Sequence, residues 1–153
     1  MARTPPPALL ALRAAICGHD LDALCACFAP DYRNETPAHP ARSFRGREQV
    51  RRNWTTILGS VPDLTAELVG WSGGVGEPLW AEWDWSGTRP DGVPVHLAGV
   101  TVLGIGGGPG DDGQQELIRW ARFYMEPVDG TDNDAGIGRA VGRRPEASAV
   151  APR

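Results

Sequence analysis

The sequence predicts an α+β domain in which three helices come first and an antiparallel sheet follows. Apolar residues recur at helical spacing up to about residue 60, and from residue 64 to residue 126 they alternate as in strands. With 153 residues, of which 41% are aliphatic or aromatic, the chain can bury a core of its own. We therefore expect a single domain over 8–128, a flexible lead-in over 1–7 and a disordered tail over 129–153.

Three segments of the first half have the spacing of amphipathic helices. The first is closed by Gly18. The second begins with Asp20 as its N-cap, carries Phe28 on its buried side and ends before Pro30, while the third covers roughly 47–59. The other positions expected on the buried sides are Leu9, Leu12, Ile16, Leu21, Leu24, Val50, Trp54, Ile57 and Leu58.

Four segments of the second half alternate between apolar and polar residues, which predicts strands at 64–71, 79–86, 95–105 and 116–126. Pro90-Asp91-Gly92 supplies a tight turn between the second and the third of them. Residues 31–40 predict an irregular segment in which Tyr32 and Asn34 alternate across a short strand. The four long strands therefore form a meander that the helices cover on one face.

Charge and cysteine content exclude several functions. The net charge of −4 argues against a surface that follows nucleic-acid phosphates, which requires a basic face. Cys25 and Cys27 are too close in sequence for a redox pair or a zinc-ligand pair, so we expect reduced cysteines and no metal. No segment is long and apolar enough to span a membrane, and we expect a cytoplasmic protein without nucleic-acid or membrane partners.

Two of the predicted strands have one polar and one apolar face. In the strand at 79–86, the polar face carries Trp80, Glu82 and Asp84, and the apolar face carries Ala81, Trp83 and Trp85. In the strand at 116–126, the polar face carries Trp120, Arg122, Tyr124 and Glu126, and the apolar face carries Ala121, Phe123 and Met125. The simplest interpretation places the polar faces in solvent. The aromatic residues on those faces favour the alternative of an enclosed, partly hydrated cavity.

Several short motifs resemble those of the SnoaL-like polyketide cyclases of the nuclear transport factor 2-like superfamily. They are Asp20-Leu21-Asp22, Phe44-Arg45-Gly46-Arg47, Val61-Pro62-Asp63-Leu64 and the Asp91-Gly92 turn. The resemblance covers about residues 8–128. It implies a cone-shaped, strongly curved and mainly antiparallel sheet wrapped around the three N-terminal helices, with an internal pocket.

The resemblance also implies which face of the sheet lies inside. It places Glu82, Asp84, Arg122 and Tyr124 in the pocket, and dimers of such proteins commonly form through sheet faces. The side chains that this leaves for a homodimer interface are Trp83, Trp85, Phe123 and Met125.

One relative, limonene epoxide hydrolase, activates water with an aspartate-arginine-aspartate set, helped by a tyrosine and an asparagine two residues apart. Tyr32 and Asn34 match that pair, and Asp84 falls at one aspartate position. Glu82 stands at the arginine position and Arg122 at the other aspartate position. Because the charges are rearranged, the hydrolase mechanism does not carry over directly.

These residues predict a cofactor-independent acid–base enzyme, a cyclase or isomerase of a polyketide-like or other hydrophobic metabolite. Asp84 is the expected general acid and base, Glu82 would interact with it electrostatically, and Arg122 would orient it or stabilise an enolate. Hydrogen bonds to the substrate would come from Tyr32, Asn34 and Tyr124, and apolar walls from Trp54, Trp80 and Trp120, with His39 near the mouth.

Three alternatives stay open. Asp84 and Arg122 could form a buried ion pair without a catalytic role. The protein could instead open an epoxide, which Tyr32 and Asn34 favour and the altered charges disfavour. It could also bind hydrophobic small molecules without catalysis. None of these functions requires a metal or an organic cofactor.

Overall fold

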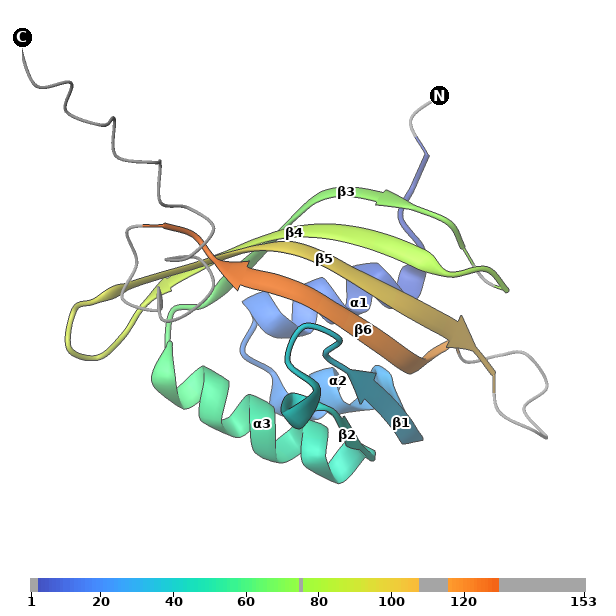
Figure 1. Ribbon diagram of the computed structural model, residues 1–153, viewed down its shortest axis with the longest axis horizontal. Coiled ribbons are helices and arrows are strands. Elements are labelled where there is room, and N and C mark those ends of the chain that lie inside the picture. Colours follow the sequence, from blue (N-terminus) through green and yellow to red (C-terminus); the bar gives the residue numbers. More distant parts are fainter. Residues whose placement is uncertain (1–2, 75, 108–115, 130–153) are drawn as a thin grey trace, which may run out of the picture.

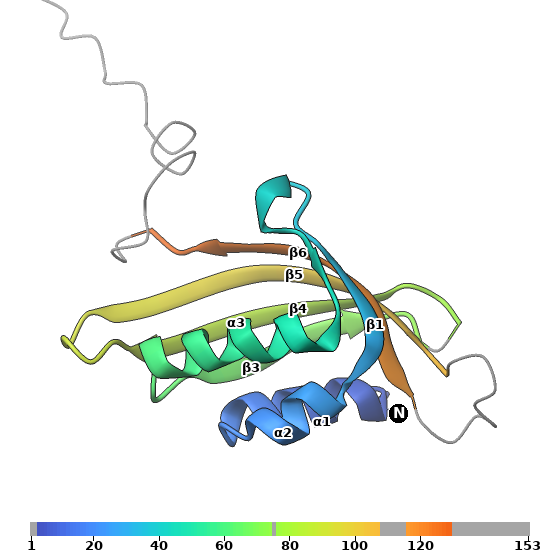
Figure 2. The ribbon, with the colours of Figure 1, turned by 90° about the horizontal axis from the view of Figure 1, so that it is seen from below.

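The structure, a computed structural model, describes residues 3–74, 76–107 and 116–129 and confirms the α+β class. Three helices, α1 (Pro7–Cys17), α2 (Leu21–Ala26) and α3 (Arg47–Ser60), lie on one face of a six-stranded sheet (Figure 1, Figure 2). The strands are β1 (Phe28–Glu35), β2 (Phe44–Arg45), β3 (Thr65–Ser72), β4 (Leu79–Thr88), β5 (Pro94–Gly106) and β6 (Leu117–Pro127). A 3-10 turn, η1 (Pro40–Arg42), precedes β2. Apart from Asp129, the predicted tail over 129–153 lies outside the described residues.

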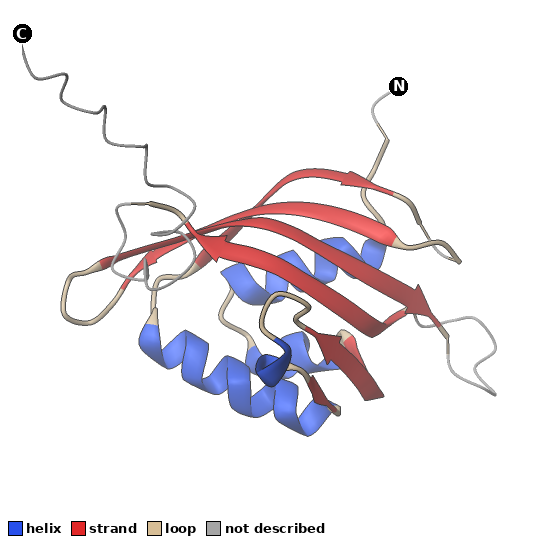
Figure 3. Cartoon of the chain, in the orientation of Figure 1, coloured by secondary structure: helices blue, strands red, loops and turns tan. Residues whose placement is uncertain are grey.

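The sheet has the order β2-β1-β6-β5-β4-β3 and is not closed. All neighbouring strands are antiparallel except β1 and β6, which are parallel. The predicted meander is therefore confirmed for β3 to β6, and β1 joins it from the helical half of the chain (Figure 3). The sheet curves over the helices (Figure 2).

The predicted second helix is too long at its C-terminal end. It stops at Ala26, and Phe28 is the first residue of β1, where it is buried and pairs with Ile118 of β6. The register of β1 against β6 shifts between Phe28 and Arg33, around Pro30. Because proline has no N–H to donate to a ladder, such an irregularity allows Pro30 to sit inside a strand.

Two local features set the starts of α2 and α3, and the first of them is the predicted cap. Asp20 caps α2, since its Oδ1 accepts a hydrogen bond from the backbone N–H of Ala23 at 2.9 Å. Gly46 precedes α3 with φ of +90°, a conformation that favours glycine, and its N–H donates to the carbonyl of Tyr32 at 2.7 Å. This contact holds the start of α3 close to β1. Among the described residues no helix is long and apolar enough to cross a membrane.

The inner face of the sheet carries Trp83 and Trp85, whereas the resemblance implied that it carries Glu82 and Asp84. Trp83 is 1% exposed and Trp85 8%, because both point toward the helices, whereas Trp80 on the outer face is 54% exposed. Phe123 and Met125 are partly buried and pack against the same core. The prediction that these four inward side chains form a homodimer interface is therefore wrong.

The helices explain this choice of face. Leu9 and Ile16 of α1 and Trp54 of α3 are almost completely buried and need an equally apolar sheet surface against them. Trp83 and Trp85 provide that surface, and the ring of Trp85 lies 5.6 Å from the ring of Trp54. Removing large apolar area from water outweighs any benefit of enclosing Glu82 and Asp84, which would have to be desolvated.

Candidate functional site

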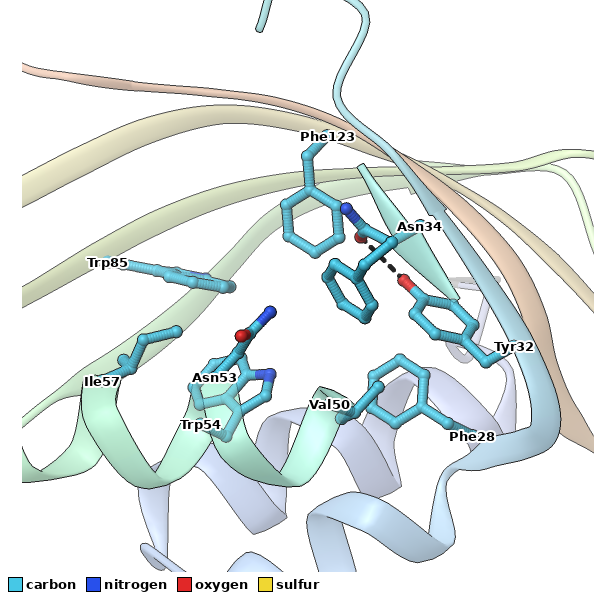
Figure 4. A pocket seen from close by; sticks show the side chains of 10 residues that line it. Phe28, Tyr32, Asn34, Val50, Asn53, Trp54, Ile57, Trp85 and Phe123 are labelled. Atoms are coloured by element: carbon cyan, nitrogen blue, oxygen red, sulfur yellow. Dashed lines mark hydrogen bonds between the residues drawn. The ribbon is translucent and has the colours of Figure 1, made fainter. Parts of the chain in front are cut away.

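A cavity of about 160 Å³ lies between α3 and the inner face of the sheet. Figure 4 shows its lining side chains, which come from one helix and four strands. They are Phe28, Tyr32 and Asn34 of β1, Phe44 of β2, Val50, Asn53, Trp54 and Ile57 of α3, Trp85 of β4, and Phe123 of β6. An engineered apolar cavity of about 150 Å³ binds benzene, so the volume suits a molecule of one or two rings.

Tyr32 and Asn34 form a hydrogen-bonded pair on the wall of the cavity, as Figure 4 shows. The Tyr32 hydroxyl donates to Asn34 Oδ1 at 3.0 Å, and Asn34 Nδ2 donates to Thr36 Oγ1 at 3.3 Å. Both Tyr32 and Asn34 are buried. Burial raises the pKa of the Tyr32 phenol far above its ordinary value, so the hydroxyl stays protonated and serves as a hydrogen-bond donor rather than as a base.

Asn53 faces the cavity from α3. It lies three residues after Val50 and four before Ile57, both of which line the cavity, so it belongs to the inward stripe of the helix. Gln49 Nε2 donates to Asn53 Oδ1 at 2.8 Å. In Figure 4 the Asn53 amide nitrogen points into the space between the lining side chains.

None of the side chains that line the described cavity carries a formal charge. They contain no carboxylate, imidazole or guanidinium group, and their polar atoms belong to Tyr32, Asn34, Asn53 and two tryptophans. An uncharged wall binds apolar surface well and leaves a charged ligand without compensation for the water that it loses. The cavity can thus hold and orient a neutral molecule through aromatic contacts and a few hydrogen bonds.

Tyr32, Asn34 and Trp54 line the cavity, and the roles predicted for them in catalysis and binding stay predictions. The placement predicted for the remaining site residues is wrong, since they lie on the outer sheet face or in a loop and do not line this cavity. These residues are His39, Trp80, Glu82, Asp84, Trp120, Arg122 and Tyr124. The alternation of a strand separates two sets of residues without saying which set faces the helices.

Asp84 and Arg122 do not form the predicted pair. His96 Nε2 donates to both carboxylate oxygens of Asp84, at 2.9 and 3.0 Å, and both side chains are more than a third exposed. Arg122 donates its Nε–H to Glu35 Oε2 at 3.0 Å. The acid–base role proposed for Asp84 depends on an enclosed site, and the outer face does not provide one.

The other predicted side chains on the outer face contact their neighbours. The Trp120 ring lies across Gly104, where a Cβ atom would come within 2.0 Å of Trp120 Nε1. The guanidinium of Arg122 lies 5.1 Å from the centre of that ring. His39 pairs with Glu126 at 3.1 Å. None of these side chains lines the cavity between α3 and the sheet.

Several cavity residues were missed or given another role by the sequence prediction. Trp85 and Phe123 were assigned to a subunit interface, and Asn53 and Phe44 were given no role in the site. A signal for Asn53 existed, because a polar residue in an otherwise apolar helix stripe needs a partner inside the fold.

The fold and the site together define a small α+β protein with an apolar pocket between its helices and an open, curved sheet. The model of the SnoaL-like domain family matches residues 9–108, and the chain belongs to this family. No curated protein matches the sequence.

Solved structures from three bacteria share the fold. A protein of Catenulispora acidiphila with a ketosteroid isomerase-like fold, solved with trimethylamine, is 21% identical with a TM-score of 0.60, covering 79% of this chain and 87% of its own. A conserved protein of Planctomyces limnophilus is 15% identical with a TM-score of 0.66, covering 79% and 92%. A protein of Sinorhizobium meliloti provisionally named a polyketide cyclase is 23% identical with a TM-score of 0.58, covering 80% and 95%. At these identities the likeness shows the fold alone.

Proposed function

We propose that the protein binds a small, uncharged and mainly apolar molecule in the cavity between α3 and the sheet. The observation that carries this proposal is the absence of any charged group among the described side chains that line the cavity. Phe and Trp side chains on its walls offer large, rigid apolar surfaces to a ring system. A polyketide-like or other hydrophobic metabolite has the matching chemistry, and the SnoaL-like family includes polyketide cyclases.

A neutral two-ring fluorescent probe, 1-aminonaphthalene, tests the proposal because its emission shifts to shorter wavelength in apolar sites. The wild-type protein is expected to bind it, and Ile57→Arg is expected to weaken binding by about tenfold or more, since a charge would enter the apolar cavity wall at a half-buried position. Thr56→Arg adds the same charge at an exposed position on the same helix and serves as the matched control. No binding by the wild type, or equal binding by both folded variants, would contradict the proposal.

Cyclase or isomerase activity without a cofactor is the second candidate, and the Tyr32–Asn34 pair favours it. A ligand carbonyl that replaces Asn34 as the acceptor of the Tyr32 hydroxyl would be polarised, which stabilises an enolate. Because none of the described cavity-lining side chains bears a carboxylate, water or the substrate itself would accept the proton. Epoxide opening would use the same pair and lacks a carboxylate there to activate water.

Proton exchange tests this activity without knowledge of the substrate. The protein is incubated in heavy water with 1-tetralone, and deuterium entering the carbon beside the carbonyl is followed by NMR. Enolisation assisted by Tyr32 predicts faster exchange with wild-type protein, a loss with Tyr32→Phe, and no change with Asp84→Asn. Exchange at the protein-free rate would support binding without catalysis.

A further inference from the structure

We infer that the bound molecule carries an uncharged hydrogen-bond acceptor, a carbonyl oxygen, and that Asn53 recognises it with the help of Trp85. The inference rests on the proposed function and adds the chemical class of the ligand. It follows from which polar atoms of the cavity wall already have partners within the protein and which do not.

The amide of Asn53 is oriented before any ligand binds. Gln49 lies one turn earlier on α3 and donates its Nε2–H to Asn53 Oδ1 at 2.8 Å, so the oxygen is occupied. The Nδ2 group of Asn53 has no acceptor among the described residues, and Figure 4 shows it directed into the cavity. A side-chain amide held in this way presents N–H donors and no acceptor.

Trp85, which lines the cavity from β4, carries a second unsatisfied donor. Its Nε1 is buried and has no hydrogen-bond partner among the described residues. The other inward-facing tryptophan of β4 does have a partner, because Trp83 Nε1 donates to Thr101 Oγ1 at 2.9 Å. A buried donor without a partner is costly, and a ligand acceptor that comes within hydrogen-bond distance of it would remove that cost.

The acceptors of the wall are used within the protein. Asn34 Oδ1 accepts from Tyr32, and Asn53 Oδ1 accepts from Gln49. The polar groups that remain available on α3 and β4 are thus N–H donors, and a carbonyl can satisfy one of them where a hydrocarbon cannot. One neutral hydrogen bond of this kind corresponds to a preference of about two- to tenfold in affinity.

A pair of ligands that share one carbon skeleton tests the inference. 1-Tetralone and tetralin differ by a carbonyl in place of a methylene, and both can compete with 1-aminonaphthalene for the cavity. The quantity measured is the ratio of their dissociation constants. Asn53→Leu is expected to shift that ratio against tetralone by about two- to tenfold while tetralin binding is kept or improved. Thr56→Leu, at an exposed position of the same helix, should leave it unchanged.

Trp85→Phe is a second variant that removes the indole N–H and keeps an aromatic wall, and it should shift the ratio in the same direction. If both ligands compete and the ratio is the same in the wild type, Asn53→Leu and Trp85→Phe, recognition of a carbonyl is refuted while the proposed binding function stands. If neither ligand nor the probe binds the wild type, the proposed function fails and this inference fails with it.

Discussion

Replacing Thr101 by valine should destabilise the protein through a single buried hydrogen bond. Thr101 is 2% exposed and Trp83 is 1% exposed, and the indole Nε1–H of Trp83 donates to Thr101 Oγ1 at 2.9 Å. Valine has nearly the shape of threonine, so packing changes little, but the indole N–H loses its acceptor. A buried donor left without a partner costs about 1–3 kcal/mol, a substantial part of the roughly 5–15 kcal/mol that stabilises a typical domain.

Urea unfolding followed by circular dichroism measures this loss, and a double-mutant cycle assigns it. Thr101→Val should cost less in the Trp83→Phe background, because the donor is then absent. The loss should also be the same at low and high protein concentration, since both residues lie within the protomer core; a residue at a subunit interface would give a concentration-dependent loss. A change below about 0.5 kcal/mol, or one that grows on dilution, would refute the inward placement of Trp83.

Three further outcomes are expected. Burial raises the pKa of the Cys27 thiol from 9.0 to about 11. Below pH 9.0 the thiol is protonated in both the folded and the unfolded chain; between pH 9.0 and 11 only the unfolded chain loses the proton, so the free energy of unfolding falls by about 1.4 kcal/mol per pH unit. Urea unfolding at several pH values should show this slope, and Cys27→Ala should flatten it. Asp84→Asn should leave probe binding in the cavity unchanged in fluorescence titrations, and a tenfold loss would return Asp84 to the site. We also propose that a second copy of the chain packs on the outer sheet face, where Trp80 and Tyr124 are 54% and 41% exposed. Trp80→Glu should then reduce dimerisation in sedimentation experiments more than Leu10→Glu on α1 does. A monomeric wild type would contradict this proposal.

The order and type of the elements could be predicted because each has a local cause in the sequence. Helical spacing and the Asp20 cap locate the helices, and strict alternation locates β3 to β6. The strand β1 was largely missed because its pairing is not local. It lies beside β6, which is about 90 residues later in the chain, and Pro30 within it is a signal against a strand.

The cavity was harder to predict than the fold, because alternation along a strand leaves two solutions. Glu82 and Asp84 on one face of β4 and Trp83 and Trp85 on the other have the same period in either arrangement. Only the helices break this symmetry, by bringing Trp54 and its apolar neighbours to one face. The better criterion within the sequence was the apolar area that each face can bury, and by that criterion the tryptophan pair faces inward.

Asn53 links the apolar stripe of α3 in the sequence to the cavity in the structure. On α3 it interrupts the stripe formed by Val50, Trp54 and Ile57, which is a cost to a helix that only needs to bury apolar surface. The cost is partly offset by Gln49, which occupies the amide oxygen and leaves the amide nitrogen facing an uncharged cavity. A packing role alone would be served better by leucine at this position. The retained amide is therefore the feature of the described site that most directly favours a ligand with a carbonyl oxygen.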